Sequence, residues 1–333
     1  MTGIRPSAGA EHARILGIGA YRPSRVVTND EVCRLIDSSD EWIRERSGIV
    51  TRRYAGPEES VVEMSVAAAG KALAQAGIPA SRVSCVILGT ITHPYQTPAA
   101  APIVANRLGA DQAGAFDVSA ACAGFTYGIA MANDMIRGGS AEYVVVIGAE
   151  KLTDFVDPTD RSTAFIFGDG AGAVVVGPAD EPGIGPVIWG ADGARHDAIT
   201  QKHSWVDLRG KESVDWPALV MQGQAVFRWA VWQIAPVARE AIRRAGITPD
   251  DLKAFIPHQA NMRITDAMIK ALDLPAHVAV ARDIAETGNT SAASIPLAME
   301  RLLESGEARS GDLALLLGFG AGLVYAAQVV TLP

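Results

Sequence analysis

Residues 117–125 read Asp117-Val118-Ser119-Ala120-Ala121-Cys122-Ala123-Gly124-Phe125, and we expect the rest of the chain to be organised around this stretch. It is typical of a buried strand that ends in small residues and a single cysteine. Apolar residues then recur at helical spacing, so Cys122 is predicted to lie in the first turn of a helix. The free N–H groups of a helix N-terminus stabilise a thiolate, and small neighbours admit a substrate carbonyl. A lone cysteine is more often structural, so a nucleophilic role depends on partners elsewhere in the chain.

The composition excludes several classes of protein. The chain has 333 residues, of which 49% are apolar and 20% charged, and its formal net charge is −8. This acidic balance argues against a general nucleic-acid binder, which needs a basic face, although it does not exclude a local basic patch. No segment has the pattern of a signal peptide or a membrane span, and the three cysteines form no CxxC pair that would indicate a disulfide or zinc site. We therefore expect a cytoplasmic protein with no metal and with neither nucleic acid nor membrane as a partner.

Strand and helix patterns alternate along the first half of the chain, which indicates an α/β fold. Strands are expected at 14–21, 83–88, 141–148 and 171–176, and helices at 31–36, from Ser38, at 60–76 and at 99–108. The helix at 60–76 has the strongest pattern, because Ala76-Gly77-Ile78-Pro79 supplies a glycine C-cap followed by a proline.

The second half repeats this order. A helix is expected at 226–245 and strands at 252–257 and 313–318; the helix end at Ala245-Gly246 matches Ala76-Gly77 at an offset of 169 residues. We predict two duplicated halves, 1–180 and 181–333, that pack face to face around a central pseudo-twofold site. The same offset carries position 122 to Ser291. The stretch 191–217 is expected to be an irregular linker or a partner-facing loop.

Two further polar stretches carry reactive side chains. His258 lies in Pro257-His258-Gln259-Ala260-Asn261, and Asn289 in Gly288-Asn289-Thr290-Ser291. Each alone is more often a hydrogen-bonded loop or turn residue, but with Cys122 they complete a Cys/His/Asn set. The glycine-rich segment 318–322 offers exposed backbone N–H groups of the kind that form an oxyanion hole.

These motifs resemble those of β-ketoacyl-acyl-carrier-protein synthase III, a family of the thiolase-fold superfamily, over nearly the whole chain. The matching segments are 38–42, 47–49, 120–125, 167–173, 257–261 and 288–296. The resemblance implies an αβαβα layer fold built from duplicated halves, a homodimer, and the first condensation of fatty-acid synthesis.

The residues then suggest a reaction. Cys122 as a thiolate attacks an acyl-CoA thioester, and the backbone N–H groups of Cys122 and Gly320 hold the oxyanion. Malonyl-carrier protein then loses CO2, and His258 and Asn289 donate hydrogen bonds to the oxygen of the enolate, which attacks the acyl-cysteine. Both thioesters are substrates, so no cofactor is expected.

The resemblance also implies binding residues. Trp42 and Arg161 would sandwich the adenine of CoA, with Arg46 and Arg263 near its phosphates. The positions of Arg228, Arg263 and Lys270 match a basic docking patch for the acidic carrier protein, although scattered solvated charges remain an alternative. The tryptophan and its neighbouring arginines, including the pair at 52–53, are also common as surface packing.

Two positions bear on the primer pocket, Thr97 and Phe319. Acetyl-restricted members carry a phenylalanine that closes the pocket across the dimer interface, and an ungapped count from Cys122 places Thr97 there. A smaller side chain leaves a longer pocket, so branched or medium-length primers are expected alongside acetyl. Ala321 replaces a family glycine and should be tolerated.

Four other classes of protein share part of this pattern. A priming ketosynthase of an aromatic polyketide pathway has the same residues, and Thr97 does not separate the two. A biosynthetic thiolase needs a second cysteine near the C-terminus, and none follows Cys122. A papain-like hydrolase has other motif spacing. A non-catalytic partner subunit is disfavoured by the intact Cys122, His258 and Asn289.

Overall fold

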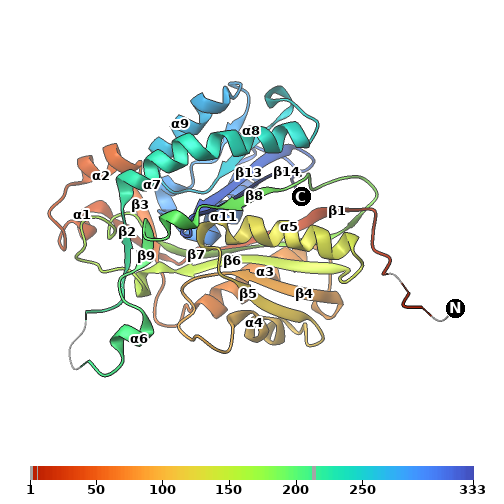
Figure 1. The fold of residues 1–333 in the computed structure, drawn as a ribbon, viewed down its shortest axis with the longest axis horizontal. Coiled ribbons are helices and arrows are strands. Elements are labelled where there is room, and N and C mark those ends of the chain that lie inside the picture. Colours follow the sequence, from red (N-terminus) through yellow and green to blue (C-terminus); the bar gives the residue numbers. More distant parts are fainter. Residues whose placement is uncertain (1–2, 6, 212–214) are drawn as a thin grey trace.

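The structure is a computed structural model that describes residues 3–5, 7–211 and 215–333. Two five-stranded sheets form its framework (Figure 1). The first sheet has the order β1 (His12–Tyr21), β7 (Asp169–Ala179), β6 (Tyr143–Lys151), β4 (Val83–Gly89) and β5 (Gly114–Val118). The second has the order β8 (Ile188–Ala191), β14 (Val324–Thr331), β13 (Leu313–Gly320), β11 (Ala254–Pro257) and β12 (Ala279–Val280).

Helices cover both sheets and separate them, as Figure 1 shows. In the middle layer, α5 (Gly124–Arg137) and α11 (Ser294–Ser305) contribute Phe125, Ile129, Ile295 and Met299 to a core shared by both sheets. The outer face of the first sheet packs on α3 (Val61–Ala76) and α4 (Ala100–Leu108). The outer face of the second packs on α8 (Ala235–Arg244) and α9 (Met262–Leu272). The predicted αβαβα layer order is confirmed.

The two sheets share one topology. In each, two parallel pairings are followed by two antiparallel ones, so that β5-β4-β6-β7-β1 corresponds to β12-β11-β13-β14-β8. The duplication predicted from the sequence is therefore present. The division at residues 180 and 181 stays a prediction; β7 ends at Ala179 and β8 begins at Ile188, on either side of it.

The middle helices fix the correspondence between the halves. A short 3-10 turn precedes each: η2 (Ala121–Ala123) before α5 and η7 (Ser291–Ala293) before α11. Ala121 and Ser291 both have positive φ, 43° and 49°, a conformation that costs a non-glycine residue free energy. They are 170 residues apart, so the counterpart of Cys122 is Ala292. The predicted counterpart, Ser291, is wrong by one residue because the repeat drifts between the matched helices and these turns.

Several predicted helices have different bounds. Only α1 (Asn29–Val32) forms in the predicted 31–36 segment, whereas α2 (Asp40–Ser47) begins as expected with Ser39 as its N-cap. The single helix predicted at 226–245 is α7 (Gly223–Trp229), a π-helical turn η5 (Ala230–Ile234) and α8. Pro236, in the first turn of α8, has no N–H to donate, which accounts for the widened turn before it.

The remaining elements are short. They are β2 (Arg25–Thr28), β3 (Thr51–Tyr54), β9 (Ile199–Gln201), β10 (Leu219–Met221), α6 (Trp205–Leu208), α10 (Ile284–Thr287) and the 3-10 turns η1 (Ala80–Arg82), η3 (Leu152–Asp154), η4 (Gly193–Arg195) and η6 (Pro249–Asp251). The segment 191–217, predicted to be irregular, contains η4, β9 and α6, and β9 pairs with β10; its residues 212–214 lie outside the described ones. None of the helices described is both long and apolar enough to span a membrane.

Candidate active site

Cys122 lies at the junction of the two halves. The chain leaves β5 at Val118, forms the 3-10 turn that contains Cys122, and begins α5 at Gly124. The residue thus precedes the α-helix by two positions instead of lying in its first turn. Its side chain is partly open to a cavity of about 860 Å³. This placement gives a ligand in the cavity access to the sulfur.

The thiol of Cys122 is protonated in the resting site. Burial raises its pKa to about 12, and the negative charge of Glu150 acts in the same direction, while the contact with the Ser291 side chain lowers it. The sequence predicted a setting that stabilises a thiolate, and in this respect it was wrong. The reason is that the opposite half of the protein encloses the turn, and desolvation of the sulfur outweighs the local helix effect.

His258 is a neutral hydrogen-bonding group. It follows β11, is 3% exposed, and burial lowers its pKa to about 3. Its Nδ1 lies 2.7 Å from Ser294 Oγ, which also accepts the Gln259 backbone N–H at 3.3 Å. Among the described residues, Nδ1 is the acceptor within reach of the Ser294 O–H, so we assign this hydroxyl as the donor to Nδ1. The ring proton then lies on Nε2, which makes this nitrogen a donor.

Asn289 has a fixed amide orientation. Its Oδ1 accepts the Ser291 backbone N–H at 2.8 Å, and its own backbone bonds to Ile166 and Gly168. Because the amide oxygen is engaged, the NH2 group is the end left for a ligand. Asn289 lines the same cavity as Cys122 and His258. The structure therefore brings together the three side chains that the sequence singled out.

The glycine-rich strand end completes the floor of the cavity. Gly320 ends β13 so close to Cys122 that a Cβ at this position would lie 2.9 Å from the cysteine backbone nitrogen and from its Cβ. Only glycine allows this approach. Phe319, beside it, contacts the His258 ring edge-to-face at a centroid distance of 5.3 Å and lines the cavity, while its role in the primer pocket stays a prediction.

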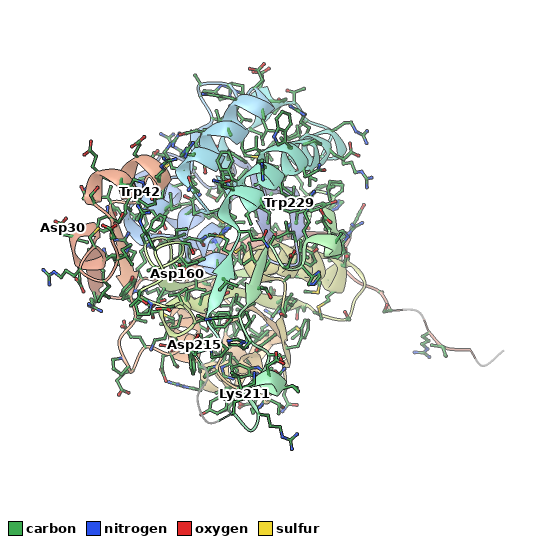
Figure 2. All side chains as sticks on the ribbon, turned by 60° about the vertical axis from the view of Figure 1, so that its left-hand side comes forward. Asp30, Trp42, Asp160, Lys211, Asp215 and Trp229 are labelled. Carbon is green, nitrogen blue, oxygen red and sulfur yellow. The ribbon has the colours of Figure 1, made fainter. Side chains whose placement is uncertain are left out.

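The mouth of the cavity carries the predicted nucleotide-binding residues. Trp42, Arg46, Arg161 and Arg263 all line it. The Arg161 guanidinium lies 4.7 Å from the Trp42 ring centroid, and Arg46 lies 5.9 Å from it. In Figure 2, Trp42 and Asp160, the neighbour of Arg161, lie on the same side of the molecule, whereas Lys211 lies at its far end. An aromatic ring between Trp42 and Arg161 requires the arginine to swing outward, because stacked groups need roughly 3.5 Å on each face.

The other basic residues differ in their surroundings. Arg228, Arg263 and Lys270 are exposed, and Arg263 lies over the Phe227 ring at 5.6 Å. Arg52, by contrast, is fully buried and donates to Asn29 Oδ1 and to the carbonyls of Val27 and Phe165. The interpretation of the pair at 52–53 as surface decoration or phosphate ligands is therefore wrong for Arg52, which has a structural role.

Thr97 lies apart from this cavity. It is exposed in the loop before α4 and does not line the cavity of its own chain. A role in primer selection therefore requires a second subunit that brings this loop to the neighbouring site.

Sequence reasoning missed a buried carboxylate. Glu150 is completely buried and accepts a hydrogen bond from Ser291 Oγ at 3.0 Å. Its only signal in the sequence is a charged residue two positions beyond the predicted apolar strand 141–148, a pattern that is common at surfaces, although the structure extends this strand to Lys151. Burial by the opposite half could not be predicted from that pattern.

The comparisons identify relatives over the whole chain. Models of 3-oxoacyl-[acyl-carrier-protein] synthase III match residues 116–193 and, for the C-terminal part, residues 242–332. A β-ketoacyl-[acyl-carrier-protein] synthase III of Streptomyces coelicolor is 61% identical, with 100% of both chains covered. Among solved structures, the priming β-ketosynthase from the R1128 polyketide biosynthetic pathway is 49% identical with a TM-score of 0.97, covering 100% of this chain and 99% of that one. The 3-oxoacyl-[acyl-carrier-protein] synthase III from Aquifex aeolicus is 38% identical with a TM-score of 0.88, covering 96% and 99%.

Identity of this extent, together with the shared layer order and the Cys/His/Asn cavity, establishes the relationship. The chain belongs to the β-ketoacyl-acyl-carrier-protein synthase III family of thiolase-fold condensing enzymes.

Proposed function

We propose that this enzyme condenses an acyl-CoA primer with malonyl-acyl-carrier protein and so initiates fatty-acid synthesis. The observation that carries the proposal is the single cavity lined by Cys122, His258 and Asn289 that opens at Trp42 and Arg161. Its inner end holds a nucleophile and two neutral hydrogen-bonding groups, and its mouth offers a stacking surface and positive charge. A thioester joined to a nucleotide fits this order of groups.

In the first half-reaction, the sulfur of Cys122 attacks the thioester carbonyl and CoA leaves as a thiolate. The backbone N–H groups of Cys122 and Gly320 would hold the oxyanion, and each such donor contributes on the order of 3 kcal/mol in measured cases. Because one thioester is exchanged for another, the free-energy change of the acyl transfer is close to zero.

In the second half-reaction, malonyl-carrier protein loses CO2 and leaves a thioester enolate. His258, neutral and with its proton on Nε2, and the NH2 of Asn289 donate to the enolate oxygen. The enolate carbon attacks the acyl-Cys122 carbonyl, and collapse of the oxyanion expels the sulfur. No step calls for a cofactor, because both carbon units arrive as thioesters.

The partners follow from the same assignment. Arg228, Arg263 and Lys270 are exposed and basic, as a surface for an acidic carrier protein requires. A homodimer is part of the proposal, since it would bring Thr97 to the neighbouring cavity. A reducing, cytoplasmic location is consistent with the three free cysteines.

A priming ketosynthase of a polyketide pathway is the second candidate, supported by the likeness to the R1128 enzyme. A non-catalytic subunit is disfavoured, because it has no need of the intact Cys122, His258 and Asn289.

The function is tested by measuring the intact mass of the enzyme after incubation with acyl-CoA and again after addition of malonyl-carrier protein. Acyl-Cys122 and then a β-ketoacyl-carrier protein are expected; an unlabelled cysteine would contradict the proposal, and Cys122→Ala is the control. Product formation only with a polyketide carrier protein would favour the second candidate.

A further inference from the structure

Glu150 is a buried carboxylate that the condensation mechanism does not use. It lies near the end of β6, at 0% exposure, and its Oε2 accepts three hydrogen bonds. The donors are Thr92 Oγ1 at 2.6 Å, Thr90 Oγ1 at 3.1 Å and the Ile91 backbone N–H at 3.1 Å. Within the described part of the chain, the carboxylate makes no ion pair. Three hydrogen bonds on one oxygen hold the group in place and leave the other oxygen free for a different contact.

That other oxygen points toward the nucleophile. Oε1 accepts the hydroxyl of Ser291 at 3.0 Å, and the Ser291 side chain lies against the Cys122 thiol. The approach of β6 to this turn is close: a Cβ on Gly148 would lie 2.1 Å from the Ala292 carbonyl oxygen. The glycine thus permits a continuous path from Cys122 through Ser291 to Glu150, which joins both halves of the protein.

We propose that Glu150 is a positioning residue that receives the proton of the Cys122 thiol through the hydroxyl of Ser291. As the sulfur attacks the acyl carbon, its proton passes to Ser291 Oγ while the serine proton passes to Glu150, which becomes a neutral carboxylic acid. The S–C bond forms and the bond to CoA breaks, with CoA leaving as a thiolate. When condensation expels the cysteine sulfur, the proton returns by the same path. This inference deepens the proposed function and rests on it.

The alternative acceptor, His258, is poorly suited. Burial holds its pKa near 3, and its Nδ1 is engaged by Ser294. For Glu150, burial raises the pKa to about 7, opposed by its hydrogen bonds to Thr92, Ile91, Ser291 and Thr90. Lys151, next in the chain, directs its Nζ to the Gly56 carbonyl and toward Asp154 and therefore does not pair with Glu150. The titratable group that Glu150 reaches through Ser291 is then the Cys122 thiol. A carboxylate that exchanges protons near neutral pH is matched to this task.

The test is the pH dependence of Cys122 alkylation by iodoacetamide, a reagent with no ionisable group. In the unaltered enzyme the rate should rise up to an inflection near pH 7 and then level off, because the thiol proton transfers internally once Glu150 is ionised. Glu150→Gln and Ser291→Ala should lose this plateau, and their rates should rise about tenfold per pH unit as hydroxide takes the proton instead. Single-turnover acylation by acetyl-CoA should show the same change.

Asp169→Asn provides the matched control. Asp169 is also buried, with a pKa raised to about 6 by burial, but its carboxylate bonds to Ala55 and Thr153 and not to the Cys122 path. This variant should keep the inflection. If Glu150→Gln fails to fold, Ser291→Ala decides, and Glu150→Asp should restore part of the plateau.

Two outcomes would overturn the inference. One is an unchanged inflection in both relay variants; the other is faster alkylation of Glu150→Gln at every pH, which would mean that the charge only opposes the thiolate. Alkylation requires no condensing activity, so failure of the proposed function would appear separately, as a lack of β-ketoacyl product with the inflection intact.

Discussion

His258 Nδ1 lies 2.7 Å from the hydroxyl oxygen of Ser294, at the start of the helix that separates the two sheets. With the Ser294 hydroxyl assigned as the donor to Nδ1, the ring proton lies on Nε2. Ser294→Ala should lower the rate of condensation by about tenfold, because the competing tautomer has an acceptor where the enolate needs a donor. Single-turnover kinetics with pre-formed acyl-enzyme measure this step. Ser305→Ala, at the other end of the same helix, is the control; an equal loss there would point to general damage to α11.

Asn289 is expected to act only after the primer is attached. With its Oδ1 held by the Ser291 N–H, Asn289→Asp would replace the free NH2 donor by an oxygen and add negative charge beside the enolate. Condensation should fall by at least about 100-fold, in line with the loss of an oxyanion donor. Acylation of Cys122, followed by intact mass, should stay within about threefold. If both steps fell together, the assignment of Asn289 to the enolate would fail.

Arg161 is expected to serve substrate binding alone. Its guanidinium is exposed and lies over Trp42, and both residues line the cavity. Arg161→Met should raise KM for acyl-CoA about tenfold, since a desolvated cation–π contact contributes 1–2 kcal/mol, roughly. Alkylation of Cys122 and KM for malonyl-carrier protein should not change. Arg195→Met, an exposed arginine paired with Asp192, controls for loss of charge.

The proposed catalytic side chains were predictable from different local patterns: His258 and Cys122 follow predicted strands, whereas Asn289 follows the short helix α10 and was marked by its turn-forming neighbours. His258 after β11 is the clearest case, since pattern alone marks both the strand and the residue that leaves it. The duplication was predictable for a related reason, because the helix ends at Gly77 and Gly246 carry the same cap.

The electrostatics of the site could not be predicted in this way. The raised pKa of Cys122, the burial of Arg52 and the path from Glu150 all depend on which distant segment covers them. Local sequence fixes whether a turn forms, but desolvation depends on the packing of the opposite half. Nothing around Glu150 in the sequence indicates that Ser291 will lie beside it.

Thr97 should influence the choice of primer only in the assembled protein. It is exposed and lies outside the cavity of its own chain. In a homodimer of the proposed kind, Thr97→Phe should shift competition among acetyl-, isobutyryl- and longer acyl-CoA thioesters toward acetyl, because a larger side chain shortens the neighbouring pocket. Acylated enzyme resolved by mass measures the preference. An unchanged preference would contradict the pocket assignment.

The pH dependence of stability isolates His258. Its pKa falls from 6.5 in the unfolded chain to about 3 in the folded protein, so below pH 6.5 the unfolded state binds the extra proton and stability is lost as the pH falls. From pH 7 to pH 5 this costs about 2 kcal/mol. Glu150 and Asp169 act in the opposite direction, because their raised pKa values favour the folded state at lower pH. The curve of unfolding free energy against pH therefore contains both effects. The difference in unfolding free energy between the unaltered protein and His258→Asn contains the effect of the histidine alone. Denaturant unfolding at pH 5 and pH 7 should give a difference in unfolding free energy that changes by about 2 kcal/mol, with the variant losing less stability in acid. Parallel curves would mean that folding leaves the pKa of His258 unchanged.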